Sequence, residues 1–267
     1  MVSTHFVKRL PELDHSDLQG YVFAGVGGGT ALVGLVTLPI MLAGSPAWLG
    51  WQLFGCATLF ASVIILALLG ALSFEQPLKT DPSKARSSPI AWQIVLPYGA
   101  MGAGYIIPAT YLPIMAQQVV ASPLVFGWAW PVFGAAAALS TVLSARLYGT
   151  FSNRQIWITS QIIMALGLVL PAAWGHISTV AAAGVCVGGT FMVITMAGMK
   201  EAHRVAGERN AQPLIAAMTA AFAIGQIVGP SLAGWTFEAT GSFAYPLLLG
   251  SFVLLSTLVP LMRLTQE

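Results

Sequence analysis

Four of the five residues from Gly25 to Gly29 are glycines, in the stretch "GVGGGT", and a run of this kind can hold the phosphates of a nucleotide. A dinucleotide-binding loop needs Gly-x-Gly-x-x-Gly between a strand and a helix, with an acid about 20 residues further on for the ribose. Gly25 and Gly27 fill the first two positions, but the third falls on Thr30, and no acid follows before Glu75. The Lys-Ser/Thr ending of a phosphate-binding P-loop is also missing. These residues therefore argue against nucleotide chemistry.

Other residue types that do chemistry are too scattered to form a site. Cys56 and Cys186 lie in apolar runs far apart, and their spacing fits neither a metal site nor a disulfide framework. His203 has charged neighbours, Glu201 and Arg204, and we interpret this group as a solvated charge cluster in a cytoplasmic loop rather than a metal site. The sequence contains no recognisable Ser/His/Asp set. We therefore expect no enzymatic activity, no metal and no cofactor.

The composition assigns the chain to a class. It is 57% hydrophobic and 7% charged, with a mean hydropathy of +0.80. A soluble domain has about 25% charged residues, so these few charges cannot cover a water-exposed surface. The sequence therefore predicts a polytopic membrane protein. The net charge of +2 is too small to indicate a nucleic-acid partner.

Apolar runs give the number of membrane spans. A spanning helix needs about 20 mostly apolar residues. Eight runs meet this length, at about 21–43, 47–73, 91–117, 124–147, 155–174, 178–200, 212–235 and 243–263, and their charged residues lie only at their ends. We therefore expect an all-α polytopic membrane protein with eight transmembrane helices.

The basic residues all fall on one side of this predicted membrane protein. They are Lys8, Arg9, Lys79, Lys84, Arg86, Arg146, Arg154, Lys200, Arg204, Arg209 and Arg263. The opposite loops, near Gly44, Ser122, His176 and Thr240, contain no Lys or Arg. Because cytoplasmic loops carry an excess of these residues, we expect both termini in the cytoplasm.

Glycines spaced four residues apart recur in the first and seventh runs, at Gly25 and Gly29 and at Gly225 and Gly229. In lipid, helices gain little from burying apolar side chains, so close approach at small residues favours their association. We therefore predict that these glycines lie at helix contacts. Pro230, directly after the second pair, can kink its helix. A second interpretation, compatible with packing, is that these residues allow helix bending during a conformational change.

Neutral polar and aromatic groups remain as candidates for binding a molecule inside the membrane. Gln226 lies mid-helix, where its amide needs a partner on a neighbouring helix or in a cavity. The other candidates for lining a cavity are Thr30, Tyr105, Thr110, Tyr111, Trp130, Thr190 and Thr195. Because Ser and Thr often bond their own helix, a structural role also stays open for the threonines. Gln52 and Gln161 lie nearer the ends of runs, and we predict structural hydrogen bonds for them.

The first two apolar runs and the last two follow the same sequence pattern. The first and the seventh runs are both rich in glycine, end at an outer loop and lead into another apolar run. The polar segment 74–90, "FEQPLKTDPSKARSSPI", then follows the second run as the C-terminus follows the eighth. This pattern indicates two six-helix repeats, a plan found in transporters. The first repeat would lack its opening four helices.

Several motifs resemble one superfamily. "GQIVGPSLAG" (225–234) and the following loop "TGSF" (240–243) are similar to the penultimate helix of major facilitator superfamily (MFS) carriers and its loop. "PYGAMGAGYIIPATYLPIMA" (97–116), "GWAWPVFGAAAAL" (127–139) and "GGTFMVITMAGMKEAHRVAG" (188–207) resemble the seventh, eighth and tenth helices of one uncharacterised bacterial branch of that superfamily. The resemblance extends over about residues 20–263.

The resemblance implies an MFS-type helical bundle in which this chain corresponds to the fifth to twelfth helices. Residues 1–20 would be a cytoplasmic N-terminal segment, and 21–73 would be two helices that complete the N-terminal bundle. Residues 74–90 would form the cytoplasmic linker between bundles, and 91–263 the six-helix C-terminal bundle. One loop departs from the family, because "ARLYGTFSNRQ" (145–155) contains two arginines but no acid for the usual gating ion pair.

The expected function is that of a secondary active transporter, in a truncated or split form, which moves a small solute by alternating access. The alternative is a non-transporting eight-helix membrane subunit or an inactive gene fragment. The expected partners are the lipid bilayer, a small solute of unknown identity and a proton. A missing N-terminal half or a second copy of the chain is a further expected partner. The resemblance places the protein in the bacterial inner membrane.

Overall fold

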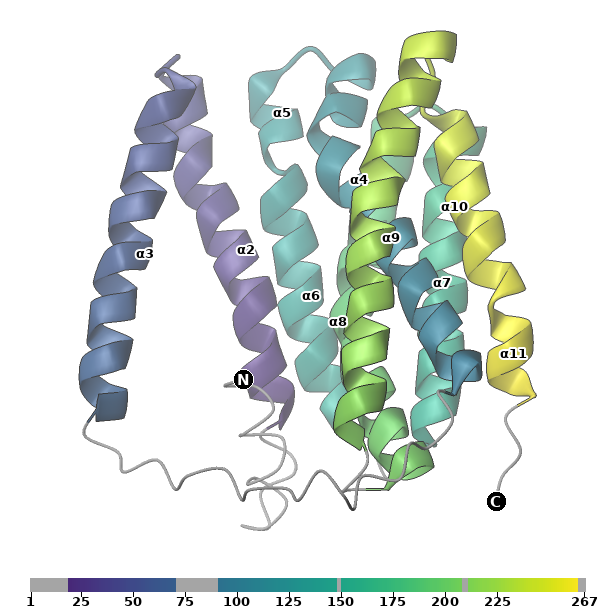
Figure 1. Cartoon of the computed structure of the whole chain (residues 1–267). Helices are drawn as coiled ribbons and strands as arrows, with labels where there is room; N and C mark the ends of the chain where they lie inside the picture. The colour runs from purple at the N-terminus through teal and green to yellow at the C-terminus, as the bar shows by residue number, and fades with distance from the viewer. Residues whose placement is uncertain (1–18, 71–90, 148–149, 208–210, 264–267) are drawn as a thin grey trace.

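The computed structural model describes residues 19–70, 91–147, 150–207 and 211–263, and the regular elements within these ranges are all α-helices (Figure 1). They are α2 (Gln19–Leu42), α3 (Ala47–Gly70), α4 (Trp92–Val119), α5 (Pro123–Gly127), α6 (Ala129–Ala145), α7 (Asn153–Ala173), α8 (Ile177–Ala206), α9 (Ala211–Thr240), α10 (Ala244–Ser256) and α11 (Leu258–Met262). A helix satisfies its own backbone hydrogen bonds, which lipid cannot do. The prediction of an all-α polytopic membrane protein is confirmed.

Seven stretches of the described residues are long and apolar enough to cross a membrane. Two of them join a short helix to a longer one, α5 with α6 and α10 with α11. The remaining predicted run is α4, which has the length of a span but a lower hydropathy than the seven. Half of its 28 residues are buried among other helices. Because α4 therefore shows little of its surface to lipid, it needs less apolar character than the outer helices.

The two interruptions have the same cause, a proline just after the break. Proline has no backbone N–H, so the carbonyl four residues before it loses its helical partner. Pro131 removes the partner of the Gly127 carbonyl, at the last residue of α5. Pro260 likewise removes the partner of the Ser256 carbonyl, at the last residue of α10. At the second break the Thr257 hydroxyl donates a hydrogen bond of 3.0 Å to the carbonyl of Val253.

The ends of several helices are set by capping residues. At the start of α7 the Ser152 hydroxyl accepts a hydrogen bond of 3.2 Å from the backbone N–H of Gln155, whose side chain accepts one of 2.9 Å from the N–H of Ser152. This reciprocal pair satisfies two amide groups that a helix start leaves open. Gly207 and Gly241 follow α8 and α9 with φ of 73° and 70°. This left-handed conformation favours glycine and ends both helices.

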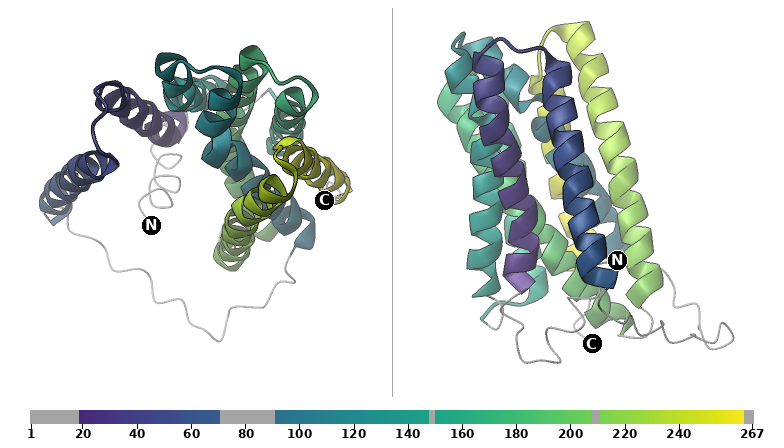
Figure 2. Two further views of the ribbon diagram at one scale, coloured as in Figure 1. Left: turned by 90° about the horizontal axis from the view of Figure 1, so that it is seen from above. Right: turned by 90° about the vertical axis from the view of Figure 1, so that its left-hand side faces the viewer.

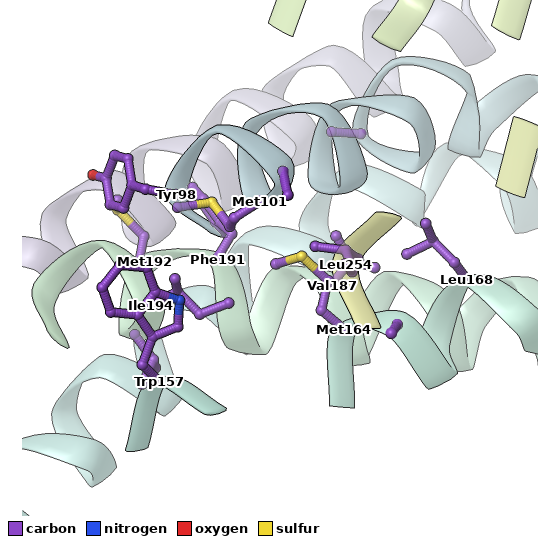
Figure 3. Packing of buried hydrophobic residues seen from close by; sticks show 14 of the residues in the cluster. Tyr98, Met101, Trp157, Met164, Leu168, Val187, Phe191, Met192, Ile194 and Leu254 are labelled. Carbon is purple, nitrogen blue, oxygen red and sulfur yellow. The ribbon is translucent and has the colours of Figure 1, made fainter. Parts of the chain in front are cut away.

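Buried side chains of α4, α7, α8 and α10, labelled in Figure 3, pack together in the core. Trp157 and Met164 of α7, Ile194 of α8 and Leu254 of α10 are completely buried. The rings of Tyr98, on α4, and Trp157 meet edge to face, with their centroids 6.0 Å apart. These contacts hold the central helix α4 against the helices around it.

Gln161 is the polar member of this core and is also completely buried. Its side-chain oxygen accepts a hydrogen bond of 2.9 Å from the Trp157 indole N–H. Its amide donates one of 2.8 Å to the carbonyl of Leu254 and one of 3.1 Å to the Thr257 hydroxyl, beside the break between α10 and α11. The predicted structural role of Gln161 is therefore confirmed, whereas Gln52, on α3, is exposed.

Helices α2 and α3 stand beside the main group of helices (Figures 1 and 2). Helix α2 packs mainly on α6, and α3 has hardly any contact except with α2. The side chains of α3 are exposed over nearly all of its described length. The predicted N-terminal segment lies outside the described residues apart from residues 19 and 20, which begin α2, and so does the predicted linker 74–90.

The described basic residues are gathered at one end of the bundle. Helix α2 begins and α11 ends at this same end (Figure 1). Arg146, Arg154, Arg204 and Arg263 lie at or near helix ends on this side, and Lys200 lies in the last two turns of α8. The arrangement agrees with the predicted alternation of loops with and without basic residues.

Candidate functional site

A cavity of about 720 Å³ lies between α2 and the helices α4, α5 and α6. It is lined by Gly25, Val26, Gly29, Thr30, Val33, Gly34, Thr37, Leu38 and Met41 of α2, by Pro113 and Gln117 of α4, by Phe126 and Gly127 of α5, and by Trp130 of α6. We call this space the α2–α6 cavity. Its volume falls within the range of small-molecule sites, about 300–1,000 Å³.

Helix α2 is held beside this cavity by three glycines that contact α6, one of which, Gly34, also borders the cavity. A methyl group placed on Gly27 would lie 2.7 Å from the carbonyl oxygen of Gly134, on α6. A methyl group on Gly20 would lie 2.7 Å from the Cβ of Ala145, and one on Gly34 would lie 2.6 Å from the ring of Pro131. The three glycines are seven residues apart, so they share one side of the helix. Their missing side chains let α2 approach α6 closely.

Gly25 and Gly29, which were predicted to lie at a helix contact, meet no neighbouring helix among the described residues. A methyl group on either would meet no atom of the described residues within 4 Å. Both glycines instead line the α2–α6 cavity. Each is two residues away from Gly27, and at roughly 100° per residue both therefore lie nearly half a turn around the helix from it. Their missing side chains widen the cavity rather than bring two helices together.

The second glycine pair does lie where two helices approach closely. A methyl group on Gly225, in α9, would meet the carbonyl oxygen of Gly99 and lie 2.7 Å from the backbone nitrogen of Ala103, both on α4. One on Gly229 would lie 2.8 Å from Ile106 and 3.0 Å from the Ala103 carbonyl oxygen. The backbones of α4 and α9 thus fit together without side chains between them. A role in gating stays a prediction for these residues.

Two of the predicted cavity residues, Thr30 and Trp130, line the α2–α6 cavity. The Thr30 hydroxyl donates a hydrogen bond of 2.9 Å to the carbonyl of Val26, in its own helix. Trp130 is 37% exposed, and its ring contacts that of Phe133 edge to face, with centroids 5.6 Å apart. The cavity therefore contains an indole whose position is supported by a second ring.

Tyr105 and Gln226 form a separate polar pair between α4 and α9. The amide of Gln226 donates a hydrogen bond to the Tyr105 hydroxyl. The Tyr105 ring is stacked between Phe191 and Phe222, with centroid distances of 5.1 and 5.6 Å and nearly parallel planes. Both members of the pair are half-buried, and neither belongs to the lining of the α2–α6 cavity. Each gives the other a polar partner inside the membrane, and their binding of a solute stays a prediction.

The other predicted cavity residues lie outside the α2–α6 cavity too. Thr110 is exposed on α4. The Tyr111 hydroxyl donates a hydrogen bond of 3.1 Å to the carbonyl of Pro230, and so links α4 to the proline-containing part of α9. Thr190 and Thr195 are buried, and their hydroxyls donate to carbonyls one turn earlier in α8, at 2.6 and 2.9 Å. These two threonines thus bond their own helix.

Twelve of the fourteen lining residues were not among the predicted cavity residues, and four of these twelve bring a hydroxyl, an amide, a proline ring or an aromatic ring to the lining. Thr37 lies seven residues after Thr30 on α2, so the shared helical face was a signal that could have identified it. Pro113, Gln117 and Phe126 come from α4 and α5. Their sequence positions give no such signal, because they reach the cavity only through the packing of α4 and α5 near α2.

The charged group at the end of α8 differs from the predicted solvated loop. Glu201 lies inside α8 and is 1% exposed. Its carboxylate oxygens accept hydrogen bonds of 2.9 and 2.8 Å from Arg204 and one of 3.4 Å from Arg154, at the start of α7. The predicted solvation is therefore wrong for Glu201. The segment 145–155 contains no acid of its own, and Glu201 of α8 provides the carboxylate that binds its Arg154.

The described residues contain no group of three His, Cys, Asp or Glu side chains that could hold a metal ion. The arrangement around the α2–α6 cavity can instead hold an organic molecule through apolar contact, one indole ring and a few neutral polar groups. No covalent chemistry is evident among the lining residues, because none of them is a nucleophile with a neighbouring base.

Comparison with protein families identifies the chain. A sequence model of the family described as "uncharacterised MFS-type transporter YbfB" matches residues 1–261. The search of curated proteins gives no match. The match covers almost the whole chain, and it agrees with the resemblance seen in four separate helices and with the helical membrane fold. The chain therefore belongs to this family of MFS-type transporters.

Proposed function

We propose that the protein is a secondary active transporter in which the α2–α6 cavity holds the solute. The cavity itself is the observation that supports this function. It lies between α2 on one side and α4, α5 and α6 on the other, and these two sides belong to different predicted bundles. A site between two bundles can open to either face of the membrane when they rock against each other.

The contact between the two predicted bundles supports such a motion. Helices α2 and α3 would form one moving unit, and α4 to α11 the other. Helix α2 meets α6 mainly through glycine, alanine and proline, at Gly20, Gly27 and Gly34 on one side and Pro131 and Ala145 among those on the other. Small residues without long side chains leave few interlocked groups to separate. One helix can therefore tilt on the other at modest cost.

The cavity favours transport over a purely structural role, because a non-transporting membrane subunit has no need of a solute-sized space beside a packed helix. None of the lining residues is an acid. Coupling to a proton would therefore need an acidic group from outside this lining. We further propose that the end of the bundle with the basic residues faces the cytoplasm of a bacterial inner membrane.

Cysteine accessibility tests this proposal. In a variant without Cys56 and Cys186, Gly29→Cys should react with a membrane-impermeant maleimide, because a thiol reacts as the thiolate and needs water around it. Alternating access predicts labelling from either side of oriented, sealed vesicles. Gly28→Cys is the matched control, because Gly28 is open but lies outside the cavity lining, and it should label slowly.

Thr240→Cys supplies the marker of sidedness in the same vesicles, and it should label only from the outer face. Labelling of Thr240→Cys from the cytoplasmic face alone would reverse the proposed orientation. Equal, slow labelling of Gly29→Cys and Gly28→Cys would show that water does not enter the α2–α6 cavity. The proposed transport site would then be wrong.

A further inference from the structure

We propose that the α2–α6 cavity selects an uncharged, mostly apolar solute that carries a planar ring and few hydrogen-bonding groups. The inference rests on the proposed function, since it takes the cavity as the site where the transported solute binds. It goes further by naming the chemical class of that solute from the groups that line the cavity.

The absence of charge in the lining decides against an ionised solute. None of the fourteen lining residues carries an ionisable acid or base. The ion pairs around Glu201 lie at the ends of α7 and α8, and none of their residues lines this cavity. A solute charge that enters an apolar site loses its hydration, and without an opposite charge nothing replaces it. An uncharged solute avoids this loss.

The hydrogen bonds already made in the lining decide against a solute with many polar groups. The hydroxyls of Thr30 and Thr37 donate to the carbonyls of Val26 and Val33, at 2.9 and 2.7 Å, so their protons are engaged within α2. Among the described lining residues this leaves the Gln117 amide and the Trp130 indole N–H as donors for a solute. A sugar would leave most of its hydroxyls without partners.

The shape of two opposite walls favours a planar ring. Gly25 and Gly29 are one turn apart, and with no side chain they leave a bare stretch of the α2 backbone on the cavity side. Across the cavity Trp130 and Phe126 supply aromatic rings, and Phe133 supports the Trp130 ring from behind at a centroid distance of 5.6 Å. Aromatic rings attract one another in stacked and edge-to-face arrangements. A flat molecule can therefore fill the space between the glycines and the indole.

Equilibrium binding of matched probes tests the inference. The purified protein in lipid nanodiscs is compared with empty nanodiscs, using radiolabelled indole, phenol and 2-naphthol as uncharged rings. Tryptamine and indole-3-acetate keep the indole ring but add a positive or a negative charge. We expect saturable binding of at least one uncharged ring, and binding of the charged indoles that is weaker by about tenfold or more.

Three variants tie the binding to this cavity. Gly29→Leu places a side chain in the cavity, where a methyl group meets no described atom within 4 Å, so it should remove binding without unfolding the protein. Gly28→Leu makes the same change outside the lining and should bind as the unaltered protein does. Trp130→Leu should weaken binding of the rings by up to about tenfold, because the stacked or edge-to-face contact with the indole is lost.

The outcomes separate this inference from the proposed function. Charged indoles that bind as tightly as indole, equal binding by Gly29→Leu and Gly28→Leu, or no saturable binding of any of the three uncharged rings would each overturn it. Binding with the expected selectivity would support the inference even if the protein moved no solute across a membrane, which would contradict only the proposed function.

Discussion

Replacing Gly27 with leucine is expected to separate α2 from α6 and to lower the amount of folded protein. Its side chain would run into the backbone of α6, 2.7 Å from the Gly134 carbonyl oxygen and 2.8 Å from the carbonyl carbon of Ala137. Backbone atoms within a helix cannot turn aside as a flexible side chain can, so the whole helix must move. We expect the free energy of unfolding to fall by roughly 3 kcal/mol, the upper end of the usual cost of overpacking.

The neighbouring glycine provides the matched control. Gly28→Leu makes the same change in helix propensity one residue away, where a methyl group meets no described atom within 4 Å. Melting temperature and yield in detergent should fall for Gly27→Leu and stay near the unaltered values for Gly28→Leu. If the two variants had the same melting temperature, the close contact of α2 with α6 would not contribute to stability.

Glu201→Gln should destabilise the end of the bundle where the basic residues lie. The Glu201 carboxylate is buried and accepts hydrogen bonds from Arg154 and Arg204, which belong to α7 and α8. Glutamine keeps the shape but removes the negative charge, and its amide N–H₂ group faces guanidinium donors. Because the charge-assisted hydrogen bonds to the buried Glu201 carboxylate are then lost, we expect a loss of about 3 kcal/mol in the free energy of unfolding.

Glu238 serves as the control for this charge change, because it is an exposed glutamate on α9. Glu238→Gln should leave the melting temperature in detergent nearly unchanged, while Glu201→Gln should lower it by several degrees. A Glu201→Gln protein that melted like Glu238→Gln would show that the buried ion pairs do not join α7 to α8.

The positions of the helices could be predicted from the sequence because apolar length and the basic loops both reflect the membrane. The run 178–200 marks the apolar part of α8, which continues to Ala206 as a helix. The breaks inside the runs 124–147 and 243–263 were not predicted. Both depend on Pro131 and Pro260, and a proline within an apolar run does not by itself show whether the helix kinks or stops.

The contacts of individual glycines could not be predicted in the same way. The stretch from Gly25 to Gly29 contains two sides of one helix, and the sequence does not show which side meets a neighbour. The four-residue spacing of Gly25 and Gly29 suggested a contact, but the contact uses the seven-residue spacing of Gly20, Gly27 and Gly34. The partner helix decides between these faces.

The ion pair of Arg154 with Glu201 shows a similar limit, since its two residues are 47 positions apart. The loop "ARLYGTFSNRQ" contains no acid, and the carboxylate reaches it only because α7 and α8 lie side by side. The α2–α6 cavity likewise combines α2 with Gln117 and Phe126, which are close to it only in the folded chain. Thr30 and Trp130 could be predicted because a polar or aromatic side chain within an apolar helix is itself unusual.

Solute flux through the α2–α6 cavity is the measurement that tests the account most directly. Proteoliposomes with the purified protein, with Gly29→Leu or with Gly28→Leu are given a mixture of metabolites and drugs, and the contents are compared with those of protein-free liposomes by mass spectrometry. We predict saturable uptake by the unaltered protein and by Gly28→Leu, and its loss in Gly29→Leu. Equal uptake by the two leucine variants, or no protein-dependent uptake by any of the three, would contradict the account.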